Sequence, residues 1–140
     1  MLHSNLLMKP IKSVFQSDIS PVDIDNHSHL HPRWQRRIKQ AIDYIHDHYY
    51  NHISQEGLSM EVNLSVPKLQ AGFKQLTGLT LASYHEEVKI KVAKSLLEET
   101  DLPLKAIAQK VGFKTHSHFG EVFKRITNMT PSTYRNQYGQ

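Results

Sequence analysis

Residues 106–134 carry a group of side chains whose chemistry suits a polyanionic ligand. Hydrophobic residues recur there at helical spacing in two runs, which Gly112 and Phe113 separate. Polar residues flank or fall within the second run, on faces that a hydrophobic core would not need: Lys114, His116, Ser117, Glu121, Lys124 and Arg125. Such side chains can hydrogen-bond to phosphates and to the edges of bases. The segment therefore predicts a helix that presents its polar side to a nucleic acid.

A sharp turn must position that helix. Gly112 can adopt the left-handed conformation that ends one helix and redirects the chain, and Thr115 is suited to cap the next helix. Two short helices joined in this way form a helix-turn-helix, whose second helix fits the major groove of B-DNA. The spacing predicts such a recognition helix after Thr115.

An earlier copy of the same pattern lies about 50 residues upstream, and two copies indicate a duplicated unit rather than a solenoid. Ser65, followed by Pro67, predicts a capped second helix in this copy. Gly78 and Asn128, which tolerate positive φ, are expected to end the two recognition helices. The copies align as follows: Leu58 with Ile107, Ser59 with Ala108, Asn63 with Gly112, Leu64 with Phe113, Leu69 with Phe119, Phe73 with Phe123, Gly78 with Asn128, Thr80 with Thr130, and Tyr84 with Tyr134.

The residues between the copies, about 80–100, predict one long helix. They contain no Pro or Gly, and hydrophobic residues follow helical spacing: Leu81, Tyr84, Val88, Val92 and Leu96. About 20 residues would span roughly 30 Å, close to one turn of B-DNA at about 34–36 Å. Such a rod could place two recognition helices in successive major-groove segments.

Residues 1–32 show no sustained hydrophobic period and are interpreted as a flexible arm or linker. His27, His29 and His31 could chelate a divalent metal from one extended strand. Nothing nearby supplies a rigid frame or a carboxylate partner, so a solvated linker is favoured.

An amphipathic helix is predicted from Pro32, with a hydrophobic stripe that runs from Trp34 to Tyr49. His46, His48 and His52 are interpreted as the solvated end of this helix. A two-histidine metal site at His48 and His52 is the alternative.

Composition sets the broad class. The 140 residues suit one domain or two very small subdomains, and 39% hydrophobic and 21% charged residues are ordinary for a soluble protein. No hydrophobic run approaches the roughly 20 residues of a membrane span, and the first residues do not resemble a signal peptide. The lack of cysteine excludes disulfides and thiolate chemistry and fits a reducing cytoplasm. A net charge of +4 mildly favours polyanionic partners.

Catalytic motifs are not found. No serine lies in a Gly-x-Ser-x-Gly turn, and no glycine-rich phosphate loop is present. We therefore predict a protein that is not an enzyme, with no catalytic residues, no cofactor and no metal.

Residues 36–138 resemble the DNA-binding domain of the AraC/XylS family of bacterial transcriptional regulators. The first copy matches through Leu58-Ser59, Leu64-Ser65, Leu69, Phe73-Lys74, Thr77-Gly78, Tyr84, Lys89-Ile90, Ala93 and Leu96-Leu97. The second copy matches through Ile107-Ala108, Val111-Gly112-Phe113, Ser117-His118-Phe119, Phe123-Lys124-Arg125, Thr130-Pro131-Ser132 and Tyr134-Arg135. The resemblance implies an all-α fold of about seven helices, with two helix-turn-helix subdomains joined by one long linker helix. It divides the chain into an arm at 1–32 and a DNA-binding domain at 33–140, with units at about 33–79 and 101–140 and the linker helix at about 80–100.

Two classes of DNA contact follow from the resemblance. The residues expected to contact bases are Pro67, Lys68, Gln70, Ala71, His116, Ser117, Gly120 and Glu121. Those expected to contact phosphates are Ser65, Lys74, Lys89, Lys114, Thr115, His118 and Lys124. Several positions depart from the family pattern: Ala71 and Glu121 replace long basic side chains, Lys89 replaces Arg, Thr127 replaces an aromatic residue, and Gly72 lies inside the first recognition helix.

Individual side chains have alternatives to these roles. Gln70 can pair with adenine, Lys68 with guanine or a phosphate, and Glu121 with cytosine N4. Each could equally be a solvated helix residue, and Glu121 could pair with Lys124 or Arg125. By spacing, four aromatic residues are assigned to the core and not to base stacking: Trp34, Phe73, Phe119 and Phe123.

The sequence thus predicts sequence-specific binding of duplex DNA and regulation of transcription in the bacterial cytoplasm, on the nucleoid, beside a promoter and in contact with RNA polymerase. Bending of the DNA is a further hypothesis. The alternative is a protein-interaction module that kept the fold but lost tight DNA binding, which Ala71, Gly72 and Glu121 favour. Relatives usually carry a separate ligand or dimerisation domain; no room for one precedes Arg33, so it is expected to be absent from this chain.

Overall fold

The computed structural model describes residues 32–140, which form seven helices and no strand. The helices are α2 (Pro32–His48), α3 (Gln55–Val62), α4 (Val66–Thr77), α5 (Leu81–Glu99), α6 (Leu104–Lys110), α7 (His116–Thr127) and α8 (Pro131–Tyr138). The predicted all-α fold with two helix-turn-helix subdomains and one long linker helix is confirmed. Residues 1–31 of the arm predicted at 1–32, with the three histidines of the alternative metal site, lie outside the described residues.

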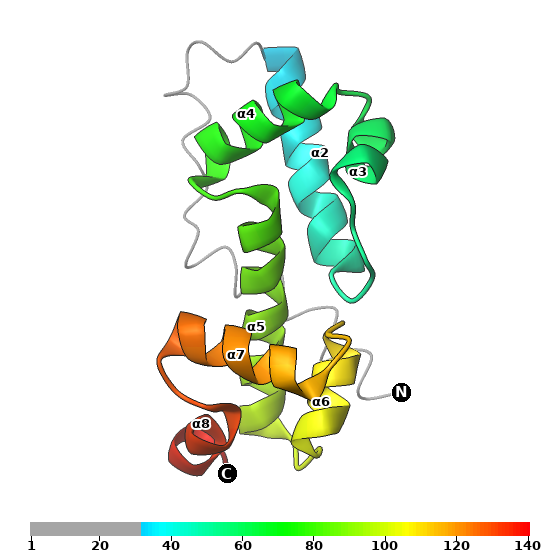
Figure 1. Ribbon diagram of the computed structural model, residues 1–140. Helices are drawn as coiled ribbons and strands as arrows, with labels where there is room; N and C mark the ends of the chain where they lie inside the picture. Colours follow the sequence, from blue (N-terminus) through cyan, green and yellow to red (C-terminus); the bar gives the residue numbers. More distant parts are fainter. Residues whose placement is uncertain (1–31) are drawn as a thin grey trace.

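Helix α5 runs along the molecule and carries one group of helices at each end (Figure 1). Helices α2, α3 and α4 pack together around its beginning, and α6, α7 and α8 pack around its second half. It is an unbroken helix of 19 residues, about 28 Å long. Thr80 caps its first turn by accepting a hydrogen bond from the Ser83 amide, and the Thr100 amide donates to the carbonyl of Leu96 at its end.

The second helices of the two units repeat each other in their local chemistry. Both α4 and α7 have 12 residues. Ser65 Oγ accepts from the Lys68 amide, and Thr115 Oγ1 accepts from the His118 amide. Gly78 with φ 77° and Asn128 with φ 63° end the two helices in the left-handed conformation. The predicted caps and helix ends are confirmed. They could be predicted from the sequence because each depends only on neighbouring residues.

The threonine at the end of each of these helices extends the repeat. Thr77 Oγ1 donates to the Phe73 carbonyl at 2.8 Å and accepts from the Leu79 amide at 3.1 Å. Thr127 Oγ1 does the same with Phe123 at 2.8 Å and the Met129 amide at 3.2 Å. Thr127, which departs from the family pattern, therefore repeats the hydrogen bonding of the first unit.

Both units share one continuous core that includes the apolar side of α5. Phe73, Phe119 and Phe123 are fully buried, as the spacing predicts. Trp34 is only partly buried against this core, and the Nζ atom of Lys68 lies 4.4 Å from its ring centroid.

The interpretation of the histidines at the end of α2 was wrong for His46. His46 is 8% exposed, and its Nε2 atom hydrogen-bonds with the Tyr84 hydroxyl at 2.7 Å. The reason is tertiary: α2 packs against α5, so this side of its last turns faces a helix and not solvent. His48 is partly buried and stacks on Tyr44 with ring centroids 4.1 Å apart, and His52 is exposed.

Within residues 32–140, no group of three or more His, Cys, Asp or Glu side chains is placed to hold a metal ion. None of the helices in this part of the chain is long and apolar enough to cross a membrane.

Candidate nucleic-acid interface

Helices α4 and α7, the candidate recognition helices, lie far apart along α5 but have the same orientation in Figure 1. Helix α4 crosses α2 near the start of α5, and α7 crosses the second half of α5. Both run from right to left in this view. The duplicated sequence therefore produces two similarly oriented helices at different levels along a single rod.

The exposed side of α4 contains every base-contact candidate of the first unit. Pro67, Lys68, Gln70 and Ala71 are exposed, whereas the buried side comprises Leu69, Gly72, Phe73 and Leu76. Gln70 Nε2 donates a hydrogen bond to Gln55 Oε1 at the start of α3. Ala71 has no polar group, so Lys68 and Gln70 supply the hydrogen-bonding side chains among these four candidates.

Helix α7 separates its two sides in the same way. His116, Ser117 and Glu121 are exposed, and Gly120 is intermediate. Phe119, Val122 and Phe123 form the buried side. A Cβ atom added at Gly120 would meet no atom within 4 Å, so the surface of α7 is open at this point.

Six of the seven phosphate-contact candidates are exposed: Ser65, Lys74, Lys114, Thr115, His118 and Lys124. Lysines therefore flank both helices, and Lys74 and Lys124 occupy corresponding positions in the last turns. Cations near a helix C-terminus are favourable neighbours of its dipole, and they remain available to neutralise an external anion. His118 also contacts the helix-turn-helix core, since its ring centroid lies 5.4 Å from that of Phe113.

Lys89 is the one phosphate-contact candidate that is not exposed. It is partly buried, and its Nζ atom donates to the Gly112 carbonyl at 3.4 Å and lies 4.9 Å from the centroid of the Phe113 ring. Burial lowers the pKa of the Lys89 ammonium group, and Glu86 partly offsets that effect. In this structure Lys89 contacts the turn of the second unit.

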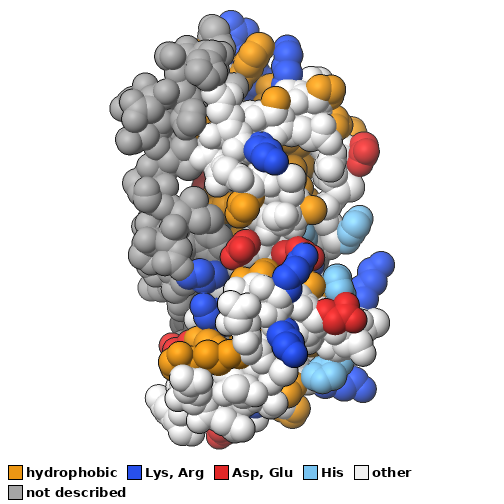
Figure 2. All heavy atoms as spheres, turned by 60° about the vertical axis from the view of Figure 1, so that its left-hand side comes forward, with side chains coloured by type: hydrophobic (Ala, Val, Ile, Leu, Met, Phe, Trp, Pro, Cys, Tyr) orange, Lys and Arg blue, Asp and Glu red, His pale blue; other side chains and the backbone are white. Residues whose placement is uncertain are grey.

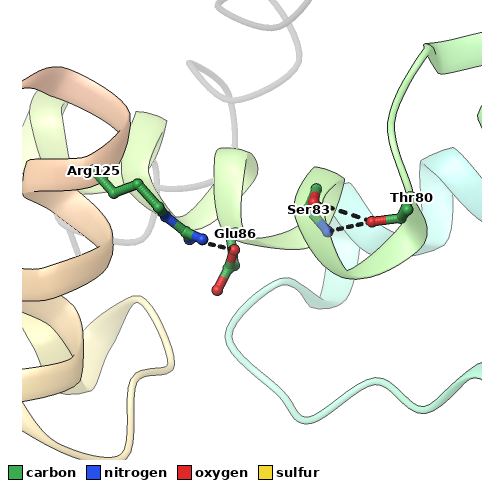
Figure 3. A network of polar contacts seen from close by, with 4 residues as sticks. All are labelled: Thr80, Ser83, Glu86 and Arg125. Carbon is green, nitrogen blue, oxygen red and sulfur yellow. Dashed lines mark hydrogen bonds and ion pairs between the residues drawn. The ribbon is translucent and has the colours of Figure 1, made fainter.

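Arg125 pairs with α5 and not with Glu121, the partner considered from the sequence. Its Nη2 atom lies 2.6 Å from Glu86 Oε1, and Figure 3 shows the two side chains meeting between α7 and α5. The side chains are 62% and 27% exposed, so the pair is expected to add no more than about 1 kcal/mol of stability. Its main effect is to orient Arg125 toward the linker helix.

Charge alone does not mark the interface on the face drawn in Figure 2. Lys and Arg side chains are spread along this face, with Asp and Glu side chains between them. Recognition by such a surface depends on the placement of individual groups, because mixed charges do not form one large attractive field.

Sequence reasoning missed three participants in this architecture: His85, Glu86 and Tyr50. Each has a partner that is distant in the sequence: His85 Nε2 donates to the Tyr49 carbonyl, Glu86 pairs with Arg125, and the Tyr50 backbone packs against Gly112. The sequence signal for His85 is its place beside Leu81, Tyr84 and Val88, which are also buried in the first half of α5.

Comparison with known proteins agrees with this architecture. A helix-turn-helix domain family matches residues 58–137. The arabinose operon regulatory protein of Salmonella typhimurium is 35% identical over 107 residues, which cover 76% of this chain and 38% of that protein. The C-terminal domain of AraT, a response regulator from Geobacillus stearothermophilus, has a TM-score of 0.73 and 26% identity, with 80% of this chain and 90% of that chain covered. The DNA-binding domain of AdpA, solved in complex with a target DNA, shares the fold with a TM-score of 0.70 at 22% identity, over 73% of this chain and 92% of that chain.

The fold and the duplicated helix pairs define a double helix-turn-helix protein of the all-α class. More narrowly, the chain belongs to the AraC family of helix-turn-helix domains. It spans little more than a third of the length of the Salmonella relative, 38%.

Proposed function

We propose that this chain binds duplex DNA in a sequence-specific manner and regulates transcription, with α4 and α7 in adjacent major-groove segments. The observation that carries the proposal is the pair of capped 12-residue helices, each with an exposed polar side, on one unbroken rod. The relative that regulates the arabinose operon and the fold shared with a DNA-bound domain support it.

Binding would begin with the phosphates. Lys74 and Lys124 lie in the last turns of α4 and α7, and Lys114 precedes α7. The capped N-termini at Ser65 and Thr115 add backbone amides, which favour anions. Neutralised phosphates release counterions, so this step supplies affinity that falls steeply with salt concentration.

Base reading would follow from the exposed sides of the two helices. In the first unit, Gln70 suits adenine, Lys68 suits guanine, and the methyl group of Ala71 suits the methyl group of thymine. In the second unit, Glu121 accepts from cytosine N4, and His116 and Ser117 lie in the first turn, where base edges are commonly reached. Gly120 allows the backbone of α7 to approach the groove closely.

The length of α5 bears on the shape of the DNA. The helix spans about 28 Å, less than the 34–36 Å or so between equivalent groove positions. We propose that the DNA bends toward the protein so that both helices can enter. A circular permutation assay should show mobility that varies with the position of the site; mobility independent of position would exclude the bend.

Selection of bound sequences from a random DNA pool tests the proposed function. The expected result is a site with two short conserved segments about one helical turn apart. Binding to that site should weaken when Gln70 or Glu121 is changed to alanine, whereas changing Gln137, exposed on α8, should have no effect. Failure to enrich any sequence would instead favour the protein-interaction module, for which the neutral Ala71 and the acidic Glu121 are the supporting observations.

Three further parts of the function are proposed on the same basis. The promoter-bound chain contacts RNA polymerase, acts in the bacterial cytoplasm on the nucleoid, and has no catalytic activity. A reconstituted transcription assay with purified polymerase should show a change in transcript level that requires the selected site. A transcript level that does not respond to this site would contradict the polymerase contact.

A further inference from the structure

The two units approach each other closely through backbone at Gly112 and Tyr50. Gly112 lies in the turn between α6 and α7 of the second unit, and Tyr50 lies just after α2 in the first unit. A Cβ atom at position 112 would lie 2.7 Å from the carbonyl oxygen of Tyr50 and 2.9 Å from its Cα atom. These distances are shorter than real Cβ contacts, so only glycine permits this approach of the two backbones.

Helix α5 holds both sides of this contact with two residues one turn apart. The buried His85 side chain donates from Nε2 to the Tyr49 carbonyl at 2.6 Å. Lys89 donates to the Gly112 carbonyl at 3.4 Å and covers the Phe113 ring. Positions i and i+4 of a helix lie on one face, so the first unit and the second unit are bound side by side on α5.

The contact continues into the candidate recognition helix of the second unit. Phe113 follows Gly112 directly, is 5% exposed, and has its ring centroid 5.5 Å from that of Phe119 in α7. In the first unit, Tyr49 is 3% exposed at the end of α2, and α2 packs against α4. A shift of either turn would therefore move a candidate recognition helix.

We propose that these five residues, Tyr49, Tyr50, His85, Lys89 and Gly112, form an interunit clasp that fixes the separation and phase of α4 and α7 before DNA is bound. Without such a contact, the two units would be held to each other only through their packing on α5, which would allow them to rock. The clasp acts as a positioning device, and the chain reads its two DNA segments at one spacing. The reading of two DNA segments at one spacing rests on the proposed function, whereas the rigidity of the free protein does not.

Distance measurements between spin labels on the free, full-length chain test the clasp. The sequence contains no cysteine, so labels attach only at introduced sites. Met60→Cys in α3, where the side chain is 82% exposed, and Gln137→Cys in α8 report on one unit each. The expected result is a single narrow distance distribution, and a distribution broader than label flexibility accounts for would overturn the proposal.

Two clasp variants and one matched control complete the measurement. Lys89→Met keeps the hydrophobic stem of the side chain but removes both polar contacts, and the double variant His85→Leu with Lys89→Met releases both units. Lys94→Met removes the same charge from α5 at a side chain whose Nζ atom lies 5.8 Å from the Tyr134 ring, inside the second unit. The distribution should at least double in width in the double variant, broaden less in Lys89→Met, and stay narrow in Lys94→Met.

An unchanged width in the double variant would overturn the clasp. If circular dichroism shows that the double variant does not fold, Lys89→Met decides alone, and an unchanged width there overturns the proposal.

A second experiment uses DNA and separates the test of the clasp from the test of the proposed function. With the selected site, insertion of one base pair between the two segments should reduce wild-type affinity at least about tenfold, a difference of about 1.4 kcal/mol. The same insertion should reduce the affinity of the Lys89→Met variant much less. Dividing each protein's affinity for the unchanged site by its affinity for the site with the insertion cancels the effect of the lost charge, because that effect is the same for both sites. An unchanged ratio would remove the link between clasp and spacing. Absence of DNA binding would contradict the proposed function alone, because the label distances still decide the clasp.

Discussion

The backbone of Gly112 packs against that of Tyr50 so closely that a methyl group at position 112 would lie 2.7 Å from the Tyr50 carbonyl oxygen. The same glycine has φ +99°, a conformation that other residues rarely adopt. Gly112 thus meets two separate demands, one from the turn of its own unit and one from the neighbouring unit.

Substitution of glycine by alanine can separate these demands. Gly78 also has positive φ, but a Cβ atom there meets nothing within 4 Å. Gly78→Ala should cost about 1–2 kcal/mol of unfolding free energy from φ strain alone. Gly112→Ala should cost about 1–3 kcal/mol more, because overpacking is added. Equal losses for the two variants in urea unfolding would contradict the close approach.

Alanine at Gly120 is expected to have opposite effects on stability and on DNA binding. The position is helical and open, so Gly120→Ala should raise the unfolding free energy by up to about 1 kcal/mol. If α7 enters the groove at this point, the added methyl group should weaken binding to the selected site about tenfold or change the preferred base. Thermal unfolding and a DNA titration measure both effects. Higher stability with unchanged binding would place Gly120 away from the DNA.

The elements that sequence reasoning predicted correctly have local causes. Ser65 and Thr115 cap helices because a hydroxyl group can reach an amide three residues ahead, and Gly78 ends α4 because it accepts positive φ. Helical spacing likewise places Phe73 and Phe119 in the core.

Predictions failed, or could not be made, where tertiary packing decides the environment. His46 follows the solvated pattern of its neighbours but faces Tyr84 on α5. Arg125 has an acid four residues before it, yet its partner Glu86 lies on another helix. Lys89 has the charge of a phosphate ligand, but only the packed structure shows that its ammonium group contacts the turn at Gly112. The base and phosphate contacts themselves stay predictions.

Stability should depend on pH through His85. Burial, the largest cause, lowers the pKa of this imidazole to about 4 from its ordinary value of 6.5. The unfolded chain therefore binds a proton between pH 6.5 and 4 that the folded protein does not bind. Stability contributed by the neutral ring is present above pH 6.5 and is lost as the pH falls toward 4, by up to about 3 kcal/mol.

The variant His85→Gln isolates this contribution, because an amide can still donate to the Tyr49 carbonyl but does not titrate in this range. Urea unfolding of both proteins at pH 7 and pH 4.5 gives the comparison, since carboxyl groups titrate in both alike. The loss of stability on acidification should be smaller in His85→Gln than in the wild type. Equal losses would show that His85 is not held neutral by burial.

Removal of a lysine that is proposed to bind phosphate should change the salt dependence of DNA binding without changing sequence preference. Lys74→Ala and Lys124→Ala should each lower the slope of log affinity against log salt concentration by about 1. Lys105, exposed on α6 and outside both candidate recognition helices, provides the control and should leave the slope unchanged. A slope equal to that of the wild type in all three variants would exclude Lys74 and Lys124 from the DNA interface.

The measurement that most directly tests two-helix reading is hydroxyl-radical footprinting on the selected site, combined with base substitutions in each segment. We expect protection of two segments about one helical turn apart on one face of the duplex. Gln70→Ala should relax base preference in one segment only, and Glu121→Ala in the other only. Protection of a single segment, or loss of preference in the same segment for both variants, would contradict the account.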